Sequence, residues 1–262
     1  INVSIVLKNR GLESTALGFT AGFTGREIRE KITSLGILHE FIHIQNGFSR
    51  INVKMKDFDG TEINGQGPDI DAAAVGQLLA RLEKLEEGDA LVLAGSIPRS
   101  IPDSIYRDIL SMLQGRDVLT VADATGDLLL NVLEYRPFLI KPNNHELGEI
   151  FHTELRTREE VIPYAHRLQE MGARNVLVSM AGQGAVLAAE DGSVRQLPAP
   201  EGVLVNAVGA GDSMVAGFLA GWMEQRDYTH AFRMGVAAGS ASAFSEHLAT
   251  RAEVEALLKN MR

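Results

Sequence analysis

Short apolar runs alternate with helical patterns over residues 69–262. The run at 91–94 ends at Gly95, and a helical pattern begins near Pro102, a residue that suits the first turn of a helix. Further runs of leucine and β-branched residues lie at 118–121, 138–140 and 176–178. Because near-continuous runs of this kind are typical of strands covered on both faces, the pattern predicts a mainly parallel sheet between helices.

The last part of the chain follows a different pattern. After Gly182, two short apolar runs at 185–188 and around Val194 flank the turn residues Asp191-Gly192, which predicts a hairpin. From Gly211 onward three helical segments complete the sequence, the last of them covering residues 251–261. We therefore expect a hairpin and then helices after the parallel strands.

Residues 37–64 predict a small separate sheet. Asn46-Gly47 is a strong type I′ hairpin signal between two extended runs. The second run alternates between apolar and polar residues, which predicts one buried face and one solvated face. Its apolar residues are Ile51, Val53 and Met55, and its polar residues are Arg50, Asn52, Lys54 and Lys56. Such a sheet suits a lid or a clasp between subunits, and a plain surface hairpin is the alternative that periodicity leaves open.

Composition narrows the class of protein. The chain has 262 residues, of which 45% are hydrophobic and 23% charged, as in an ordinary soluble globular protein and unlike a disordered or collagen-like chain. Its formal net charge of −9 argues against broad contact with nucleic acid or anionic lipid. A small anionic ligand remains compatible with that charge, because a few cations and helix ends can set the local field.

Cysteine is absent, which excludes disulfides, thiolate nucleophiles and zinc–thiolate sites and fits a reducing cytoplasm. The longest apolar run, 214–223, is about half the length of a membrane span. The sequence starts at Ile1 without a methionine or a visible signal peptide, and we expect the true N-terminus to lie upstream.

One prominent motif matches a zinc-binding pattern, but its surroundings do not favour the helix that zinc binding needs. Residues 39–43, His-Glu-Phe-Ile-His, fit the pattern of zinc proteases, which requires a helix that brings both imidazoles to one face. Gly36 precedes the motif, Asn46-Gly47 follows it, and Ile42 and Ile44 suit a strand. Residues four apart on a strand are separated by about 13 Å, too far to share one metal ion. We therefore do not expect zinc hydrolysis.

The segment 206–213 carries the most informative motif. A glycine-alanine-glycine turn leads into an apolar helix, so backbone N–H groups can converge on one point where the helix dipole adds positive charge. This arrangement predicts an anion site. Asp212 stands at its mouth, either as an acceptor of a proton or as the N-cap of the helix, and the motif alone does not decide between these roles.

Two other segments follow predicted strands. In Lys141-Pro142-Asn143-Asn144-His145-Glu146, an amide and a carboxylate suit a hydrated Mg²⁺, although Asn143 and Glu146 could equally form a capping box. The glycines of 179–184 allow close approach to a nucleotide, and a β-turn explains them as well. The P-loop, a complete dinucleotide-binding glycine motif and the nucleophile elbow are all absent from the sequence.

These three segments, in this order, resemble the ribokinase-like carbohydrate kinases, also called the phosphofructokinase B family. The similarity extends from Ile1 to about Glu253 and implies a three-layer α/β/α fold, with residues 1–262 as one kinase domain and a small β lid around 37–64. The resemblance implies Asp212 as catalytic base and Asn143 and Glu146 as organisers of magnesium and phosphate, with the magnesium ion bound through water. Its implied anion hole comprises Gly209, Ala210, Gly211 and Asp212. Its implied ATP site comprises Lys141, Ser179, Met180, Ala181, Gly182, Gln183, Gly184, Gly211 and Asp212.

Shorter matches resemble one branch of this family, the 1-phosphofructokinases and tagatose-6-phosphate kinases. They lie at 2–4, 49–54, 62–65 and 95–98, and they imply that Asn2, Arg50 and Ser96 contact the sugar phosphate. The guanidinium of Arg50 could grip phosphate bidentately, and a solvated surface charge is its alternative. Members of the family carry several dozen residues before the position of Ile1, including a sugar-binding aspartate, a Gly-Gly-Lys-Gly stretch and lid strands. We expect that part to be missing here.

The resemblance implies ATP- and Mg²⁺-dependent conversion of fructose 1-phosphate to fructose 1,6-bisphosphate. Tagatose 6-phosphate is the alternative substrate, and a catalytically silent protein that binds sugar phosphate is the alternative from another class. The expected partners are these small molecules, without nucleic acid or membrane, together with a second copy bound through the lid. The expected location is the cytoplasm.

Overall fold

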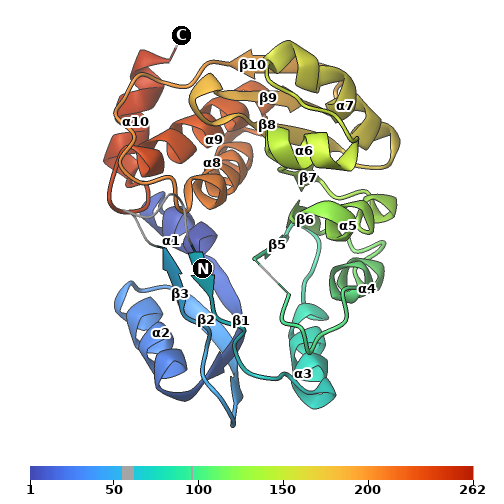
Figure 1. Cartoon of the computed structure of the whole chain (residues 1–262), viewed down its shortest axis with the longest axis vertical. Helices are drawn as coiled ribbons and strands as arrows, with labels where there is room; N and C mark the ends of the chain where they lie inside the picture. The colour runs from blue at the N-terminus through green and yellow to red at the C-terminus, as the bar shows by residue number, and fades with distance from the viewer. Residues whose placement is uncertain (55–61, 96, 262) are drawn as a thin grey trace.

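A computed structural model describes residues 1–54, 62–95 and 97–261, and its centre is a six-stranded sheet between two layers of helices (Figure 1). The sheet has the order β10-β9-β8-β7-β6-β5. Strands β5 to β8 are parallel, whereas β9 is antiparallel to both of its neighbours. The strands are β5 (Ala90–Ala94), β6 (Leu119–Asp123), β7 (Leu139–Ile140), β8 (Asn175–Ser179), β9 (Ala185–Ala188) and β10 (Val194–Leu197). The predicted parallel sheet and its terminal hairpin are confirmed.

Alternate residues of the central strands enter two separate hydrophobic cores. In β8, Val176 and Val178 belong to one core, while Leu177, between them, belongs to the other. One face of the sheet is covered by α3 (Ala72–Leu82), α4 (Ile105–Met112), α5 (Gly126–Leu130), α6 (Asn144–Ile150) and α7 (Arg158–Glu170). The other face is covered by α1 (Asn2–Asn9), α8 (Ala210–Gln225), α9 (Tyr228–Ala243) and α10 (Arg251–Asn260). Both faces are therefore buried, which explains the continuous apolar runs.

A second sheet has two parallel strands, β1 (Thr15–Ala21) and β2 (Leu38–Ile44), joined by α2 (Gly22–Ser34). The register runs from Thr15 opposite Leu38 to Ala21 opposite Ile44. The predicted hairpin at Asn46-Gly47 is therefore wrong, because β2 pairs with the preceding strand β1 and not with the run that follows it. Gly47 has a φ of +84°, so the chain does turn there, but it leaves the sheet.

The strand assignment of the zinc-protease-like motif is confirmed, because residues 39–43 lie within β2. His39 Nε2 forms a hydrogen bond of 3.0 Å with Thr33 Oγ1, and Glu40 forms an ion pair with Arg81 at 3.3 Å. Two side chains of the motif thus connect β2 to α2 and α3.

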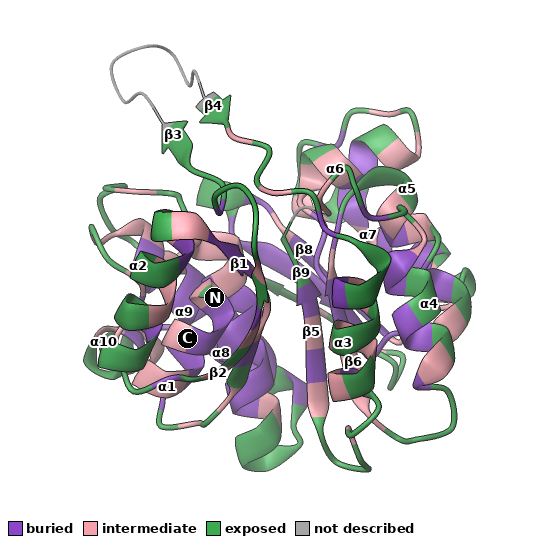
Figure 2. Cartoon of the chain, turned by 90° about the horizontal axis from the view of Figure 1, so that it is seen from below, coloured by how far each residue is buried: buried purple, intermediate pink, exposed green. Residues whose placement is uncertain are grey.

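The described strands of the predicted lid form a short antiparallel pair, β3 (Asn52–Lys54) and β4 (Glu62–Asn64), which projects from the body in Figure 2. Its predicted buried face is wrong for the single chain, since Ile51, Val53 and Ile63 are 57%, 46% and 61% exposed. These side chains share one face because Val53 pairs directly with Ile63 and Ile51 lies two residues away. Met55 and Lys56, which were predicted to continue the alternation, lie outside the described residues.

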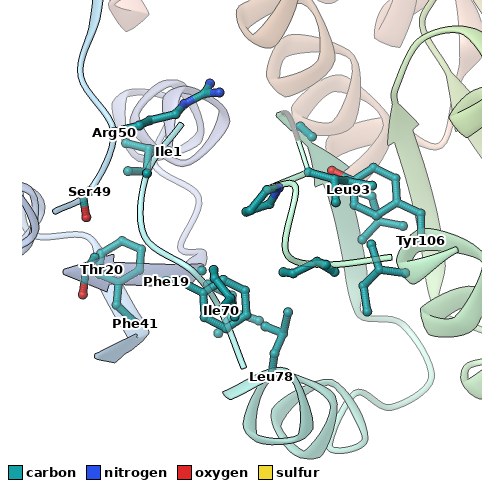
Figure 3. A pocket seen from close by; sticks show the side chains of 18 of the residues that line it. Ile1, Phe19, Thr20, Phe41, Ser49, Arg50, Ile70, Leu78, Leu93 and Tyr106 are labelled. Atoms are coloured by element: carbon teal, nitrogen blue, oxygen red, sulfur yellow. The ribbon is translucent and has the colours of Figure 1, made fainter. Parts of the chain in front are cut away.

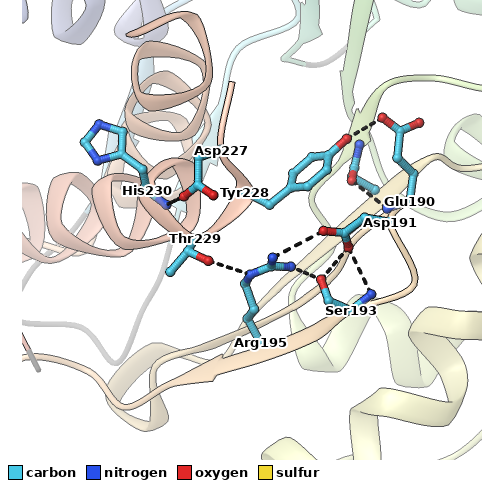
Figure 4. A network of polar contacts seen from close by, with 9 residues as sticks. Glu190, Asp191, Ser193, Arg195, Asp227, Tyr228, Thr229 and His230 are labelled. Atoms are coloured by element: carbon cyan, nitrogen blue, oxygen red, sulfur yellow. Dashed lines mark hydrogen bonds and ion pairs between the residues drawn. The ribbon is translucent and has the colours of Figure 1, made fainter. Parts of the chain in front are cut away.

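The antiparallel edge of the central sheet is tied to the start of α9 by a polar network (Figure 4). Tyr228 donates a hydrogen bond to Glu190, and Arg195 Nε donates to Thr229 Oγ1 at 2.9 Å. Burial and the bond to Glu190 raise the pKa of Tyr228 above its ordinary value, so its hydroxyl remains a donor at neutral pH. The network fixes the hairpin against the helix pair that follows it.

Helices α8 and α9 pack closely because glycines face the partner helix. A Cβ atom on Gly217 would lie 2.6 Å from the carbonyl oxygen of Met234 and 2.7 Å from the Cβ of Ala238. On Gly221 it would lie 2.8 Å from the Cα of Ala231. Only hydrogen side chains permit this approach, so the two helices pack closely at these positions. In the described part of the chain, each helix is too short or too polar to cross a lipid bilayer.

Candidate active site

The loops after β7 and β8 meet at one edge of the central sheet. Ser179 N donates to the Pro142 carbonyl at 3.1 Å, and Asn143 and Ser179 form an isolated parallel bridge. The carboxyl ends of parallel strands form the edge at which open α/β sheets bind ligands. The segments 141–146 and 179–184, predicted separately, are therefore neighbours.

The third predicted segment forms the first turn of α8. Gly209 is the N-cap, with a left-handed φ of +80°, and the N–H of Ala210 donates to the Ala207 carbonyl at 3.3 Å. The N–H groups of Gly211 and Asp212 have no hydrogen-bond acceptor within the described residues. These two groups remain available for the predicted anion hole, whereas Ala210, predicted to contribute, has its N–H engaged.

Two glycines of this turn lie close to neighbouring side chains. At Gly209 a Cβ atom would lie 2.6 Å from Leu248 Cδ2, in addition to the strain of a left-handed φ. At Gly211 it would lie 3.2 Å from Lys141 Nζ. The second distance also brings the ammonium group of Lys141 to the anion hole, where its charge adds to that of the helix dipole.

Asp212 does not cap the helix. It is the third residue of α8 and makes no capping hydrogen bond; its Oδ2 instead accepts a hydrogen bond of 2.9 Å from Asn2 Nδ2. Asn2 belongs to α1, which packs against α8, so the contact joins opposite ends of the sequence. The capping interpretation of Asp212 is wrong, and its carboxylate is held by an amide in the first turn of α8.

Sequence reasoning missed Asp123, the last residue of β6. Its Oδ1 lies 3.2 Å from Lys141 Nζ, and the two side chains are 19% and 7% exposed. Burial raises the pKa of Asp123 above its ordinary value, the ammonium of Lys141 opposes this rise, and the carboxylates of Asp212 and Glu146 add to it. The sequence signal that could have identified Asp123 is its place at the end of a buried apolar run, directly before a loop with Gly126.

Asn143 and Glu146 form a complete capping box at the start of α6. Asn143 Oδ1 accepts from the N–H groups of His145 and Glu146, and Glu146 Oε2 accepts from the N–H of Asn143 at 2.8 Å. The capping interpretation is therefore confirmed. Glu146 Oε1 has no hydrogen-bond donor among the described residues, so this oxygen has an acceptor site free for a second role.

The residues present fit a hydrated Mg²⁺ better than a metal caged by protein. The described parts of the chain hold no group of three or more His, Cys, Asp or Glu side chains arranged around one point. Mg²⁺ keeps several waters and binds one or two carboxylates together with substrate phosphates. Glu146 Oε1, close enough to Asp123 to influence its pKa, offers one such ligand.

The predicted ATP loop is a tight turn between β8 and β9. Residues Ala181–Gln183 form a 3₁₀ turn, closed by the bond from Gln183 N to the Met180 carbonyl at 2.9 Å. A Cβ atom on Gly184 would lie 2.0 Å from the Leu197 carbonyl oxygen, so this glycine has a packing role. Gly182 is exposed with open space around it, as close approach of a ligand would require.

Arg50 lines a cavity of about 350 Å³ and lies at its end in Figure 3. Its backbone is anchored by Ser49, whose Oγ accepts from the N–H of Ala21 at 2.9 Å and whose carbonyl accepts from Thr24 Oγ1 at 2.9 Å. Ile1 lines the same cavity, and its neighbour Asn2 contacts Asp212. Ser96, predicted to contact the sugar, lies outside the described residues.

Known proteins similar to this chain are carbohydrate kinases. Residues 1–254 match the family described as pfkB family carbohydrate kinases. The 1-phosphofructokinase of Bacillus subtilis is 47% identical over 262 residues, which cover 100% of this chain and 86% of that protein. The D-tagatose-1-phosphate kinase of Bacillus licheniformis is 34% identical over 249 residues, covering 95% of this chain and 81% of that protein.

The fold also has solved counterparts. The structure of Arabidopsis thaliana ribokinase complexed with ribose and ATP superposes with a TM-score of 0.79 at 20% identity, covering 98% of this chain and 86% of that one. At this identity the similarity concerns the fold alone. The predicted ribokinase-like three-layer architecture is confirmed.

Proposed function

The chain belongs to the pfkB family of carbohydrate kinases, and we propose that it transfers the γ-phosphoryl group of ATP to fructose 1-phosphate, giving fructose 1,6-bisphosphate and ADP. The observation that carries this proposal is the first turn of α8. There the carboxylate of Asp212, held by Asn2, stands beside two unpaired N–H groups and the ammonium of Lys141. A base next to an anion hole suits phosphoryl transfer to an alcohol.

In the proposed reaction, the free primary hydroxyl of the sugar phosphate attacks the γ-phosphorus while Asp212 accepts its proton. The bond from the γ-phosphorus to the bridging oxygen breaks, and ADP leaves. The N–H groups of Gly211 and Asp212 stabilise charge on the transferring group, and Lys141 neutralises charge on the phosphates. Asn2 orients the carboxylate of Asp212 toward the hydroxyl, since its amide occupies Oδ2 at 2.9 Å.

Glu146 and Asn143 would hold hydrated Mg²⁺ beside the phosphates, with the cation supplying neutralisation of the triphosphate charge when bound. The loop 179–184 would contact ATP through its exposed backbone at Gly182. An exposed apolar segment that includes Val203, Leu204 and Val205 precedes the anion hole and offers a surface for the adenine ring. These assignments belong to the same proposal.

The choice of sugar rests on the relatives. The Bacillus subtilis relative, named 1-phosphofructokinase, supports fructose 1-phosphate, with Arg50 as the group that binds its phosphate. A second candidate is a tagatose phosphate, supported by the relative named D-tagatose-1-phosphate kinase. Release of ADP with fructose 1-phosphate, tagatose 1-phosphate and tagatose 6-phosphate as acceptors ranks these candidates by kcat/KM. A silent sugar-phosphate-binding protein would release ADP with none of them.

The substitution Asp212→Asn tests the mechanism. Because an amide cannot accept the hydroxyl proton, we expect kcat to fall by ~10²–10⁴-fold while folding and ATP affinity are retained. Asp227→Asn is the matched control, since Asp227 is a true N-cap whose side chain accepts from His230 N at 2.6 Å. An Asp212→Asn enzyme that keeps more than about half of the parent kcat would leave the proposed reaction without its base.

We further propose that residues 1–262 act as one kinase domain, located with its phosphorylated substrates in the cytoplasm. Two copies would associate through the lid, because the shared face of Ile51, Val53 and Ile63 is apolar and exposed. Association would cover this face and leave the polar face of the lid toward the substrate.

A further inference from the structure

Two serines are buried where α8 and α9 pack against each other. Ser213 directly follows Asp212 in α8, Ser242 lies near the end of α9, and the two serines are 0% and 1% exposed. Their Oγ atoms are 2.7 Å apart. A buried hydroxyl without a hydrogen-bond partner is costly, so the partners of these two groups show what they contribute.

The direction of the hydrogen bonds around the two serines follows from their donors. Ser213 Oγ donates to the Gly209 carbonyl at 2.8 Å, and Ser242 Oγ accepts from the N–H of Ala249 at 2.8 Å. A hydroxyl has one hydrogen to donate, so between the two serines Ser242 is the donor and Ser213 the acceptor. The result is a directed series of bonds, which we call the serine chain: Ala249 N–H to Ser242 Oγ, Ser242 Oγ to Ser213 Oγ, and Ser213 Oγ to the Gly209 carbonyl.

The serine chain ends on the residue that begins the predicted anion hole. The Gly209 carbonyl accepts from Ser213 Oγ and also from Ser213 N, at 2.9 Å. Because a peptide group is planar, holding this carbonyl also fixes the adjoining N–H of Ala210. The N–H groups of Gly211 and Asp212, which the proposed reaction uses, follow directly in the same helical turn.

The other end of the serine chain is anchored by the capping box of α10. Ala249 directly precedes Thr250, the N-cap of this helix. Glu253 accepts from Thr250 N at 2.9 Å and from Ser245 Oγ at 2.8 Å. These bonds order the segment 245–250, so the N–H of Ala249 has a defined position. The serine chain thus connects a capped helix start with the first turn of α8 through the interior of the protein.

We infer that Ser213 and Ser242 are positioning residues, whose hydroxyls hold the first turn of α8 in the orientation that presents its N–H groups to the transferring phosphoryl group. This inference rests on the proposed function. Both serines are buried, so they act through the Gly209 carbonyl and not by touching substrate. Stabilisation by N–H groups depends on geometry that is set before the reaction, so a small displacement of the turn lowers the rate.

Steady-state kinetics with ATP and fructose 1-phosphate test this role in Ser213→Ala, Ser242→Ala and the double variant. We expect each single substitution to lower kcat by about tenfold and to leave both KM values within about threefold, because the displaced N–H groups act on the transition state. The double variant should lose no more than either single one, since one break interrupts the whole serine chain. Ser242→Cys fills the same space with a weakly bonding group and should behave like Ser242→Ala.

Asn175→Ala is the matched control. Its amide donates from Nδ2 to the Phe138 carbonyl at 2.7 Å, and it is buried at the end of β8 opposite Ser179. Loss of this bond should lower the urea midpoint and leave kcat within about twofold. Losses that multiply in the double variant, or the parent kcat in Ser242→Cys, would show that the serines only fill space and would overturn the inference.

Hydrogen exchange tests the serine chain without catalysis. Ser242→Ala should speed exchange of the Ser213 amide by about tenfold or more, and Ser213→Ala should do the same at the Ala249 amide. Unchanged exchange at either amide would contradict the inference. A parent protein that releases no ADP with any sugar phosphate would instead refute the proposed function, whereas the exchange rates would still show whether the serine chain holds the turn.

Discussion

At the scale of single residues, Lys141 is the cation of the site and pairs with the carboxylate of Asp123. Its buried ammonium lies between the carboxylate of Asp123 and Gly211 in the first turn of α8. A buried lysine is stable only when it is paired, and Asp123 supplies the pair in the absence of phosphate. The ion pair therefore keeps a cation ready where the phosphates of ATP are proposed to bind.

Asp123→Asn should weaken ATP binding more than sugar binding. Without its partner, Lys141 loses its fixed position, and loss of a charge-assisted phosphate contact raises the KM for ATP by about tenfold or more. Breaking a buried pair should also lower the free energy of unfolding by on the order of 3 kcal/mol. Steady-state kinetics and urea titration measure both effects. The control is Asp127→Asn, an exposed aspartate on α5; equal shifts in the two KM values would contradict the role.

Glu146→Gln separates the metal role of Glu146 from its capping role. The glutamine carbonyl can still accept the bond from Asn143 N, so the thermal midpoint should change little. The Mg²⁺ concentration for half-maximal activity should rise several-fold because a carboxylate ligand is lost. Glu160→Gln makes the same change in the capping box of α7 with Thr157 and should leave Mg²⁺ dependence unaltered. A parallel response of both variants would reduce Glu146 to a cap.

At the scale of elements, periodicity was a good guide where strands are buried on both faces. The runs at 118–121 and 176–178 became β6 and β8, because continuous apolar sequence can only be satisfied between two helix layers. It failed at Asn46-Gly47, where a local turn signal cannot reveal that β2 already has β1 as its partner. The three site segments were identified, but Asp123 was not, since its ion pair with Lys141 joins different strands.

The glycines between α8 and α9 lead to a paired prediction. Gly217→Ala should lower the free energy of unfolding by about 1–3 kcal/mol, because the new methyl group overlaps the Met234 carbonyl. Gly76→Ala on α3 should raise it by about 0.5–1 kcal/mol, because no atom lies within 4 Å and alanine favours helix. Urea denaturation measures both. Stabilisation by both substitutions would show that α8 and α9 are not in close contact.

At the scale of the whole molecule, the lid places apolar surface where a single chain cannot bury it. Ile63→Lys should therefore lower the dimer fraction in sedimentation experiments, since it puts a charge at the centre of the apolar face. Asn64→Lys is the control, because Asn64 pairs with Asn52 on the opposite face of β3–β4. A parent protein that sediments as a monomer at micromolar concentration would contradict the proposed association.

The long helix α8 links tryptophan fluorescence to the site, because it carries Trp222 as well as Asp212. The chain has one tryptophan, Trp222, in the last turns of the helix whose first turn carries Asp212, about 15 Å away along the axis. Its indole stacks on Tyr228 with ring centroids 4.5 Å apart. A ligand that displaced the first turn together with the rest of α8 would also shift the indole. Emission from the one tryptophan would then report events at the predicted anion hole without any label.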